Sequence, residues 1–172
     1  MNLLPNITPL FRLHAKRRLR RLAAEDAVAT QERELRALLA KAANTTFGRA
    51  HGFAAIKTVE EFQKRVRLRR YEDFWAEYWQ RGFPNITDST WPGRMPYFAL
   101  TSGTSTGTTK YIPCSEEMVR ANKRAAIDVV VHHLANRPKS RMMGGKSFML
   151  GGSTDFQALA PGVSAPSRYN VL

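Results

Sequence analysis

The chain has 172 residues, which is about one ordinary domain and enough to bury a core. Its 27 lysine and arginine residues outnumber 14 aspartate and glutamate residues, so the formal net charge is +13 and negatively charged partners have to be considered. The single cysteine, Cys114, excludes an internal disulfide and with it a disulfide-stapled secreted domain.

The first predicted element is a basic helix within residues 1–34. Six cations fall in one ten-residue span with leucines between them: Arg12, Lys16, Arg17, Arg18, Arg20 and Arg21, with Leu13, Leu19 and Leu22. A basic helix of this type suits an anionic membrane surface or phosphates. No aromatic-basic module or zinc-ligand spacing accompanies it. This favours a solvated helix whose leucines pack on the domain over a nucleic-acid binding element.

A longer helix is predicted next. Leu35, Leu38, Leu39 and Ala42 follow the i, i+3, i+4, i+7 spacing of one helix face. The helical pattern stops near the polar residues that follow, so we expect this helix to end at a turn at residues 47–48.

Two shorter helices are predicted before residue 95. Thr58 and Glu61 have the spacing of a capping box, which predicts a short helix carrying Val59, Phe62 and Val66. Aromatic residues then recur at helical spacing and predict a helix with an aromatic face: Tyr71, Trp75, Tyr78 and Trp79. An aromatic face at this spacing is more typical of a core than of a ligand platform.

Two strands are expected on either side of residues 101–110. Residues 91–93 (Trp-Pro-Gly) indicate a turn, and residues 95–100 are aromatic and apolar, as in a short strand. Residues 111–113 form a second β-like run that a proline closes. The segment between them is therefore predicted to be a hairpin connection.

Residues 101–110 are the strongest functional signal of the chain, because hydroxyl side chains, two glycines and a terminal lysine share one short stretch. Glycine lets the backbone approach an oxyanion, hydroxyls donate hydrogen bonds, and lysine supplies a point charge. Only three residues separate Gly103 from Gly107, and Lys110 follows three positions later, so the stretch is not a Walker loop. Its composition also suits a flexible surface loop, but the terminal lysine and strand flanks favour phosphate binding.

A further helix is predicted after the second strand. Ser115 is a plausible N-cap, and the helix should end before Pro138. Its buried face is predicted to hold Ile127, Val130, Val131 and Leu134. The adjacent His132 and His133 point to different faces, so no shared metal site is predicted. For Cys114, without a partner motif, a structural role is favoured over that of a reactive thiol.

The last predicted strand covers residues 146–150 and leads into Gly151, Gly152, Ser153 and Thr154. In a parallel α/β sheet, ligands collect at loops that leave the carboxyl ends of strands. The Gly-Gly-Ser-Thr loop therefore either helps to form a substrate pocket or is a turn that needs positive φ at glycine; both remain open.

The loop resembles that of the adenylate-forming enzymes, a Ser/Thr-Gly-rich loop that ends in lysine and holds ATP phosphates. Its longer spacing is similar to one branch, the plant auxin-amidating acyl-acid amido synthetases and their bacterial relatives. The resemblance extends over residues 38–53, 59–62, 68–73 and 146–154, and covers about residues 35–162. Thr109 departs from the proline or arginine that often precedes the lysine in relatives.

The resemblance implies an α/β fold: N-terminal helices followed by the start of the large nucleotide-binding domain of an adenylate-forming enzyme. It implies a ligase that uses ATP and Mg²⁺ to adenylate a carboxylic acid and then transfers the acyl group to an amino acid amine. Carried over by position, the phosphate site comprises Thr101, Ser102, Gly103, Thr104, Ser105, Thr106, Gly107 and Lys110. No catalytic residue or metal ligand is carried over to this chain.

The length departs from the resemblance, because enzymes of this branch have several hundred residues and their later aromatic and ribose-binding motifs have no counterpart here. Three segments are expected: a basic helical segment (1–34), a partial N-terminal domain (35–162) and a divergent tail (163–172). We therefore expect the N-terminal portion of a ligase, which is a truncated or frame-shifted gene product or a partial sequence and is inactive alone. The alternative is a non-catalytic basic module that binds nucleic acid or anionic surfaces.

The expected location is the cytoplasm. No stretch of the sequence approaches the length of a membrane span, and residues 1–5 are too short and too interrupted for a signal peptide.

Overall fold

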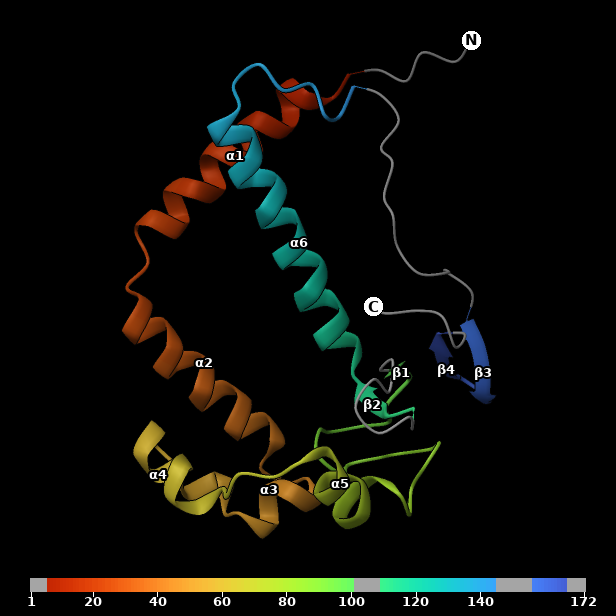
Figure 1. The fold of residues 1–172 in the computed structure, drawn as a ribbon. Coiled ribbons are helices and arrows are strands. Elements are labelled where there is room, and N and C mark those ends of the chain that lie inside the picture. The colour runs from red at the N-terminus through yellow and green to blue at the C-terminus, as the bar shows by residue number, and fades with distance from the viewer. Residues whose placement is uncertain (1–5, 101–108, 145–155, 167–172) are drawn as a thin grey trace. The chain divides into compact units, whose positions relative to one another are not determined.

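The computed structural model describes residues 6–100, 109–144 and 156–166 (Figure 1). The α-helices are α1 (Thr8–Ala23), α2 (Ala27–Ala42), α3 (Thr46–Ala50), α4 (Val59–Arg65), α5 (Tyr71–Phe74) and α6 (Glu116–Asn136). A 3₁₀ turn, η1 (Phe53–Ala55), and a π-helical turn, η2 (Trp75–Trp79), complete the helical elements of these ranges. The strands are β1 (Tyr97–Leu100), β2 (Tyr111–Cys114), β3 (Phe156–Ala160) and β4 (Val163–Pro166). The predicted mixed α/β class is therefore confirmed.

Two compact units make up the chain, and each is assembled from separated stretches. One unit comprises Met1–Asp26 and Glu117–Leu150, and the other comprises Ala27–Glu116 and Gly151–Leu172. The predicted boundaries at residues 34 and 162 follow the resemblance rather than compactness, and they stay a prediction.

The four strands form one sheet in the order β2-β1-β4-β3. β1 and β2 are antiparallel, with Leu100 opposite Tyr111, which confirms the predicted hairpin. β2 also contains Pro113, which its edge position tolerates because an edge strand has one unpaired side. The described sheet is mixed, since β1 and β4 are parallel whereas β3 and β4 are antiparallel. The predicted strand at 146–150 and the loop at 151–154 lie outside the described residues.

Strand β4 occupies an interior position in the sheet although it falls within the predicted divergent tail. Val163 and Ala165 are 0% and 1% exposed. They pack with apolar residues that precede and include β1: Ile86, Met95, Phe98 and Leu100. The segment at 163–166 is therefore part of the core of its unit.

A second core cluster lies under α2, α3 and η1, and contains Leu39, Ala42, Phe47, Phe53 and Ile56. The predicted face of α2 is confirmed for Leu39 and Ala42, whereas Leu38 is 51% exposed.

The chain turns sharply between α2 and α3, earlier than the predicted turn at 47–48. The Thr45 hydroxyl donates to the Ala42 carbonyl (2.7 Å) and accepts from Gly48 N–H (2.9 Å), so it ends one helix and caps the next. A Cβ at Gly48 would lie 2.0 Å from the Ala42 carbonyl oxygen, so only glycine fits there. Phe47 and Gly48 consequently lie inside α3.

Helix α4 begins as predicted, because the Thr58 hydroxyl accepts a hydrogen bond from Glu61 N–H. The Glu61 carboxylate accepts from Lys57 N–H instead of the Thr58 N–H of a standard capping box. Val66 lies beyond the helix as its C-cap.

In the other unit, α1 crosses α6 (Figure 1), and polar side chains join the two helices. Arg12 donates to the carbonyls of Leu134 (2.8 Å), Arg137 (3.2 Å) and Ser140 (2.7 Å), and thereby satisfies carbonyls at and beyond the C-terminal end of α6. Arg18 forms two hydrogen bonds of 2.8 Å with Asp128.

The other predictions for these two helices are mixed. Helix α6 ends at Asn136, before Pro138, as predicted. Its buried face is confirmed for Val131 and Leu134, but Ile127 is 44% exposed. On α1, Leu13 is 50% exposed, so its predicted packing is wrong. Leu19 and Leu22 are half-buried and Ala15 is 2% exposed, and arginine side chains add the polar contacts of α1 with α6.

None of the helices in the described ranges is long and apolar enough to cross a membrane.

Candidate functional site

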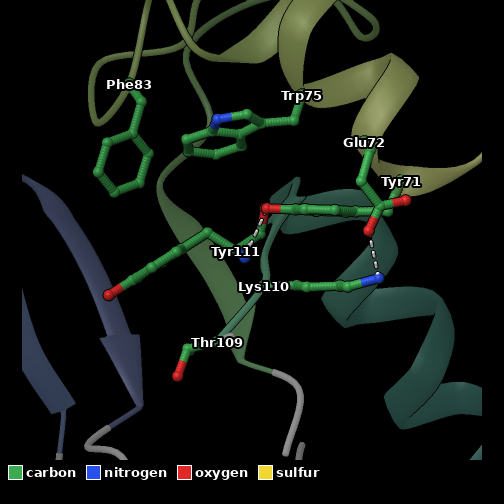
Figure 2. Close-up of a pocket in the computed structure, with 7 residues that line it drawn as sticks. All are labelled: Tyr71, Glu72, Trp75, Phe83, Thr109, Lys110 and Tyr111. Atoms are coloured by element: carbon green, nitrogen blue, oxygen red, sulfur yellow. Dashed lines mark hydrogen bonds and ion pairs between the residues drawn. The ribbon is translucent and has the colours of Figure 1, made fainter. Parts of the chain in front are cut away.

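A pocket of about 430 Å³ lies where the loop of residues 101–110 joins β2 (Figure 2). Its lining side chains come from α5, η2, the segment before β1, the end of the loop and the start of β2: Tyr71, Glu72, Trp75, Phe83, Thr109, Lys110 and Tyr111. All of them belong to one compact unit. Four aromatic side chains and one ion pair therefore share a single concave surface.

The aromatic side chains of the pocket contact one another. The Phe83 ring lies 5.3 Å from that of Trp75 and 5.0 Å from that of Tyr111, in both cases between ring centroids. The Tyr71 ring stacks on Trp75 at 6.0 Å. Such offset and edge-on pairs stabilise the arrangement and fix the shape of the pocket.

Tyr71 joins α5 to the first residue of β2. Its hydroxyl accepts a hydrogen bond from Tyr111 N–H (2.9 Å) and donates one to the Tyr111 carbonyl (3.3 Å). Burial raises the pKa of this phenol, because the charged form loses solvation. Tyr71 is therefore neutral at physiological pH and keeps the proton that it donates.

Lys110 is the charged group of the loop end, and it lies over Tyr71 (Figure 2). Its Nζ is 2.7 Å from Glu72 Oε1 and 5.1 Å from the centroid of the Tyr71 ring. The Lys110 side chain is 24% exposed, whereas that of Glu72 is 60% exposed. The hydrogen bond from Lys110 holds the pKa of Glu72 below its usual value, so this carboxyl is ionised at neutral pH.

The structure brings together only part of the predicted phosphate site. Lys110 is in the pocket, while the predicted positions Thr101, Ser102, Gly103, Thr104, Ser105, Thr106 and Gly107 lie outside the described residues. Thr109, to which no phosphate contact was assigned, lines the pocket beside Lys110.

Several pocket residues were not predicted from the sequence. The sequence patterns predict no site role for Glu72, Phe83 and Tyr111, and they predict Tyr71 and Trp75 in a core. For Tyr71 and Glu72 the sequence does contain a signal, because both lie in the segment at residues 68–73 that resembles the family. The rest of the predicted aromatic face does pack in the two core clusters, as Tyr78 and Trp79 do.

Two other groups that could take part in chemistry, the Cys114 thiol and the His51 imidazole, are packed against neighbouring residues. Cys114 is 2% exposed, and burial raises the pKa of its thiol, as expected for a structural cysteine. The His51 ring is tilted against that of Phe47, with 4.2 Å between the ring centroids, and its Nε2 lies 3.1 Å from an Arg69 nitrogen. Within the described residues, no group of three His, Cys, Asp or Glu side chains is arranged to hold a metal ion.

Comparison with known proteins identifies one related domain. A model of the GH3 family N-terminal domain matches residues 17–158, which include every residue of the pocket. No curated protein matches the chain.

Proposed function

Since this chain belongs to the GH3 family, which includes the acyl-acid amido synthetases, we propose that it is the N-terminal portion of such an ATP-dependent ligase. The enzyme would adenylate a carboxylic acid and transfer its acyl group to the amine of an amino acid. The observation that supports this function most strongly is the position of Lys110. It stands at the end of the Ser/Thr/Gly loop and presents its ammonium group in an aromatic-walled pocket.

The chemistry requires little covalent help from the protein. A carboxylate attacks the α-phosphate of ATP and pyrophosphate leaves; an amine then attacks the acyl carbon and AMP leaves. The protein has to orient the reactants and stabilise the negative charge that grows on the leaving pyrophosphate. A lysine ammonium and preorganised backbone and hydroxyl donors are suited to this task.

Each part of the loop has a proposed role in that task. Gly103 and Gly107 would allow close backbone approach to the phosphates, and Lys110 would neutralise the outer phosphates. Hydrogen bonds to the phosphate oxygens would come from the remaining predicted positions, Thr101, Ser102, Thr104, Ser105 and Thr106.

The described residues fit Mg²⁺ only as an ion that arrives with the nucleotide. Among the described residues that line the pocket, Glu72 is the one carboxylate, and Lys110 already engages it. Mg²⁺ binds ATP through phosphate oxygens and retains several waters, so few protein ligands are needed. The carboxylic acid and the amino acid remain the proposed substrates, and the cytoplasm remains the proposed location.

The experiment that tests this function is a titration of the chain with Mg²⁺-ATP, for the wild type and for Lys110→Met. Loss of a point charge on the phosphates should weaken binding by about tenfold or more. Lys57→Met is the matched control, because Lys57 is an exposed lysine of the same unit that does not line the pocket. Equal ATP affinities for all three proteins would contradict the proposal.

A second candidate function, a basic module that binds nucleic acid or anionic surfaces, is favoured by the distribution of charge. The unit made of Met1–Asp26 and Glu117–Leu150 contains 13 of the 27 basic residues but only 4 of the 14 acidic ones, so it carries +9 of the formal +13. Arg17, Arg20 and Arg21 are exposed on α1. This distribution would support salt-sensitive binding to polyanions.

A further inference from the structure

We propose that Glu72 is a positioning residue for Lys110. In the free protein, the Glu72 carboxylate holds the Lys110 ammonium group over Tyr71; when an anionic phosphate binds to this ammonium group, it takes the place of the carboxylate. This inference deepens the proposed function and rests on it. It is carried by the three-residue arrangement of Tyr71, Glu72 and Lys110 (Figure 2).

The Tyr71 side of this arrangement is fixed. The Tyr71 hydroxyl holds both the N–H and the carbonyl of Tyr111, the residue that follows Lys110. The same ring lies 5.1 Å from the Lys110 ammonium, a distance at which a cation is attracted to an aromatic face. Tyr71 thus fixes the position of the backbone next to Lys110 and also attracts the Lys110 ammonium group to its ring.

The Glu72 side is exchangeable. Its side chain is 60% exposed, so the carboxylate can rotate into water without leaving a buried acceptor, whereas Lys110 is only 24% exposed. Ion pairs with such an exposed partner are weak. Arg70 also contributes to lowering the pKa of Glu72, so a released carboxylate would still have positive charge nearby.

A phosphate on Lys110 would compete with Glu72 for the same donors. Carboxylate and phosphate oxygens both accept from an ammonium group, and two anions beside one cation repel each other. The carboxylate therefore has opposite effects in the two states: it orders Lys110 when the site is empty and opposes the anion that enters. Release of Glu72 is the expected consequence of binding.

The test uses the whole chain and inorganic tripolyphosphate as the probe, so that adenine contacts do not contribute. The pKa of the Glu72 carboxyl is measured by NMR in wild type, with and without saturating tripolyphosphate, and in Lys110→Met without it. Tripolyphosphate affinity is then measured for wild type, Glu72→Gln and Glu34→Gln. Glu34→Gln removes the same charge from an exposed position, where the ion pair with Arg33 spans 3.9 Å.

The proposal predicts that Lys110→Met raises the pKa of Glu72 and that tripolyphosphate raises it in wild type, because both remove the ammonium from the carboxylate. It predicts that Glu72→Gln binds tripolyphosphate about threefold to tenfold more tightly than Glu34→Gln at low salt, and that salt reduces this difference.

The failures of the two proposals can be told apart. If tripolyphosphate and ATP bind but leave the pKa of Glu72 low, or if Glu72→Gln binds no more tightly than Glu34→Gln, the exchange is overturned while the phosphate site stands. If neither anion binds to a folded chain, the proposed phosphate site and the exchange both fail. An unchanged pKa of Glu72 in Lys110→Met would overturn the pairing by itself.

Discussion

The hydroxyl of Tyr71 bridges the backbone of Tyr111, accepting from its N–H at 2.9 Å and donating to its carbonyl at 3.3 Å. We predict that Tyr71→Phe lowers the free energy of unfolding by about 1–2 kcal/mol, because the variant keeps the ring but leaves this backbone N–H without its acceptor. Urea denaturation followed by tryptophan fluorescence measures the change.

Tyr78→Phe is the control for that experiment. It removes a hydroxyl from the same aromatic segment, but one for which no hydrogen bond is seen within the described residues. Equal losses of stability in the two variants would mean that the Tyr71–Tyr111 bridge contributes nothing specific.

Arg69 supports a neighbouring aromatic cluster in which its side chain is only 7% exposed. Its Nε lies 3.1 Å from Glu77 Oε2, and a terminal nitrogen lies 3.1 Å from His51 Nε2. Its guanidinium carbon lies within 6.0 Å of the ring centroids of Phe47, Phe74 and Tyr78.

We predict that Arg69→Met costs about 2–4 kcal/mol of stability, because it removes the ion pair and the ring contacts of a buried charge. Arg67→Met tests the same partner from an exposed position, since Arg67 also binds Glu77 but is 69% exposed. It should cost less than about 1 kcal/mol. Thermal unfolding of the two variants side by side measures the difference; similar shifts would contradict the buried role of Arg69.

Much of the fold follows from local patterns in the sequence, but the pocket does not. The Thr58 cap, the end of α6 before Pro138 and the β1–β2 hairpin each depend on a few neighbouring residues, and each was predicted. Tyr71 and Lys110 are far apart in the chain, and no local pattern indicates that they meet.

The aromatic segment shows a second reason why the pocket does not follow from the sequence pattern. Read at 3.6 residues per turn, positions 71, 75, 78 and 79 share one face, which favoured a core. The chain forms a π-helical turn at Trp75–Trp79, which changes the angular spacing of the side chains. Tyr71 and Trp75 therefore line the pocket while Tyr78 and Trp79 pack in the cores.

Cys114 gives a prediction for alkaline pH. Burial raises the pKa of its thiol in the folded chain above the ordinary value of 9.0. As the pH rises past 9.0, the thiol of the unfolded chain ionises first, so stability is complete below this pH and declines above it. Urea unfolding of wild type and Cys114→Ala between about pH 8 and pH 10.5 should show a steeper decline in wild type. Parallel curves would contradict this assignment.

The arginines of α1 divide into structural and exposed groups. Arg12 and Arg18 contact α6, so their replacement should destabilise this unit. Arg17, Arg20 and Arg21 are exposed, and the variant Arg17→Gln/Arg20→Gln/Arg21→Gln should remain folded.

We predict that this triple variant binds RNA or anionic vesicles more weakly and with a shallower salt dependence, while its affinity for ATP stays within about twofold of wild type. Titrations between about 50 and 200 mM salt measure both properties. A collapse of ATP affinity in the triple variant would move the nucleotide site from the Lys110 pocket to the basic unit.

The most direct test of the central claim asks which lysine lies next to the phosphates of bound ATP. An ATP analogue with an acyl phosphate on its terminal phosphoryl group transfers the acyl group to a nearby lysine amine, and mass spectrometry then identifies the modified residue among the eight lysines of the chain. The account predicts acylation of Lys110 that excess ATP suppresses. Labelling that falls on Lys16 or Lys123 instead, or labelling of Lys110 that ATP does not suppress, would contradict it.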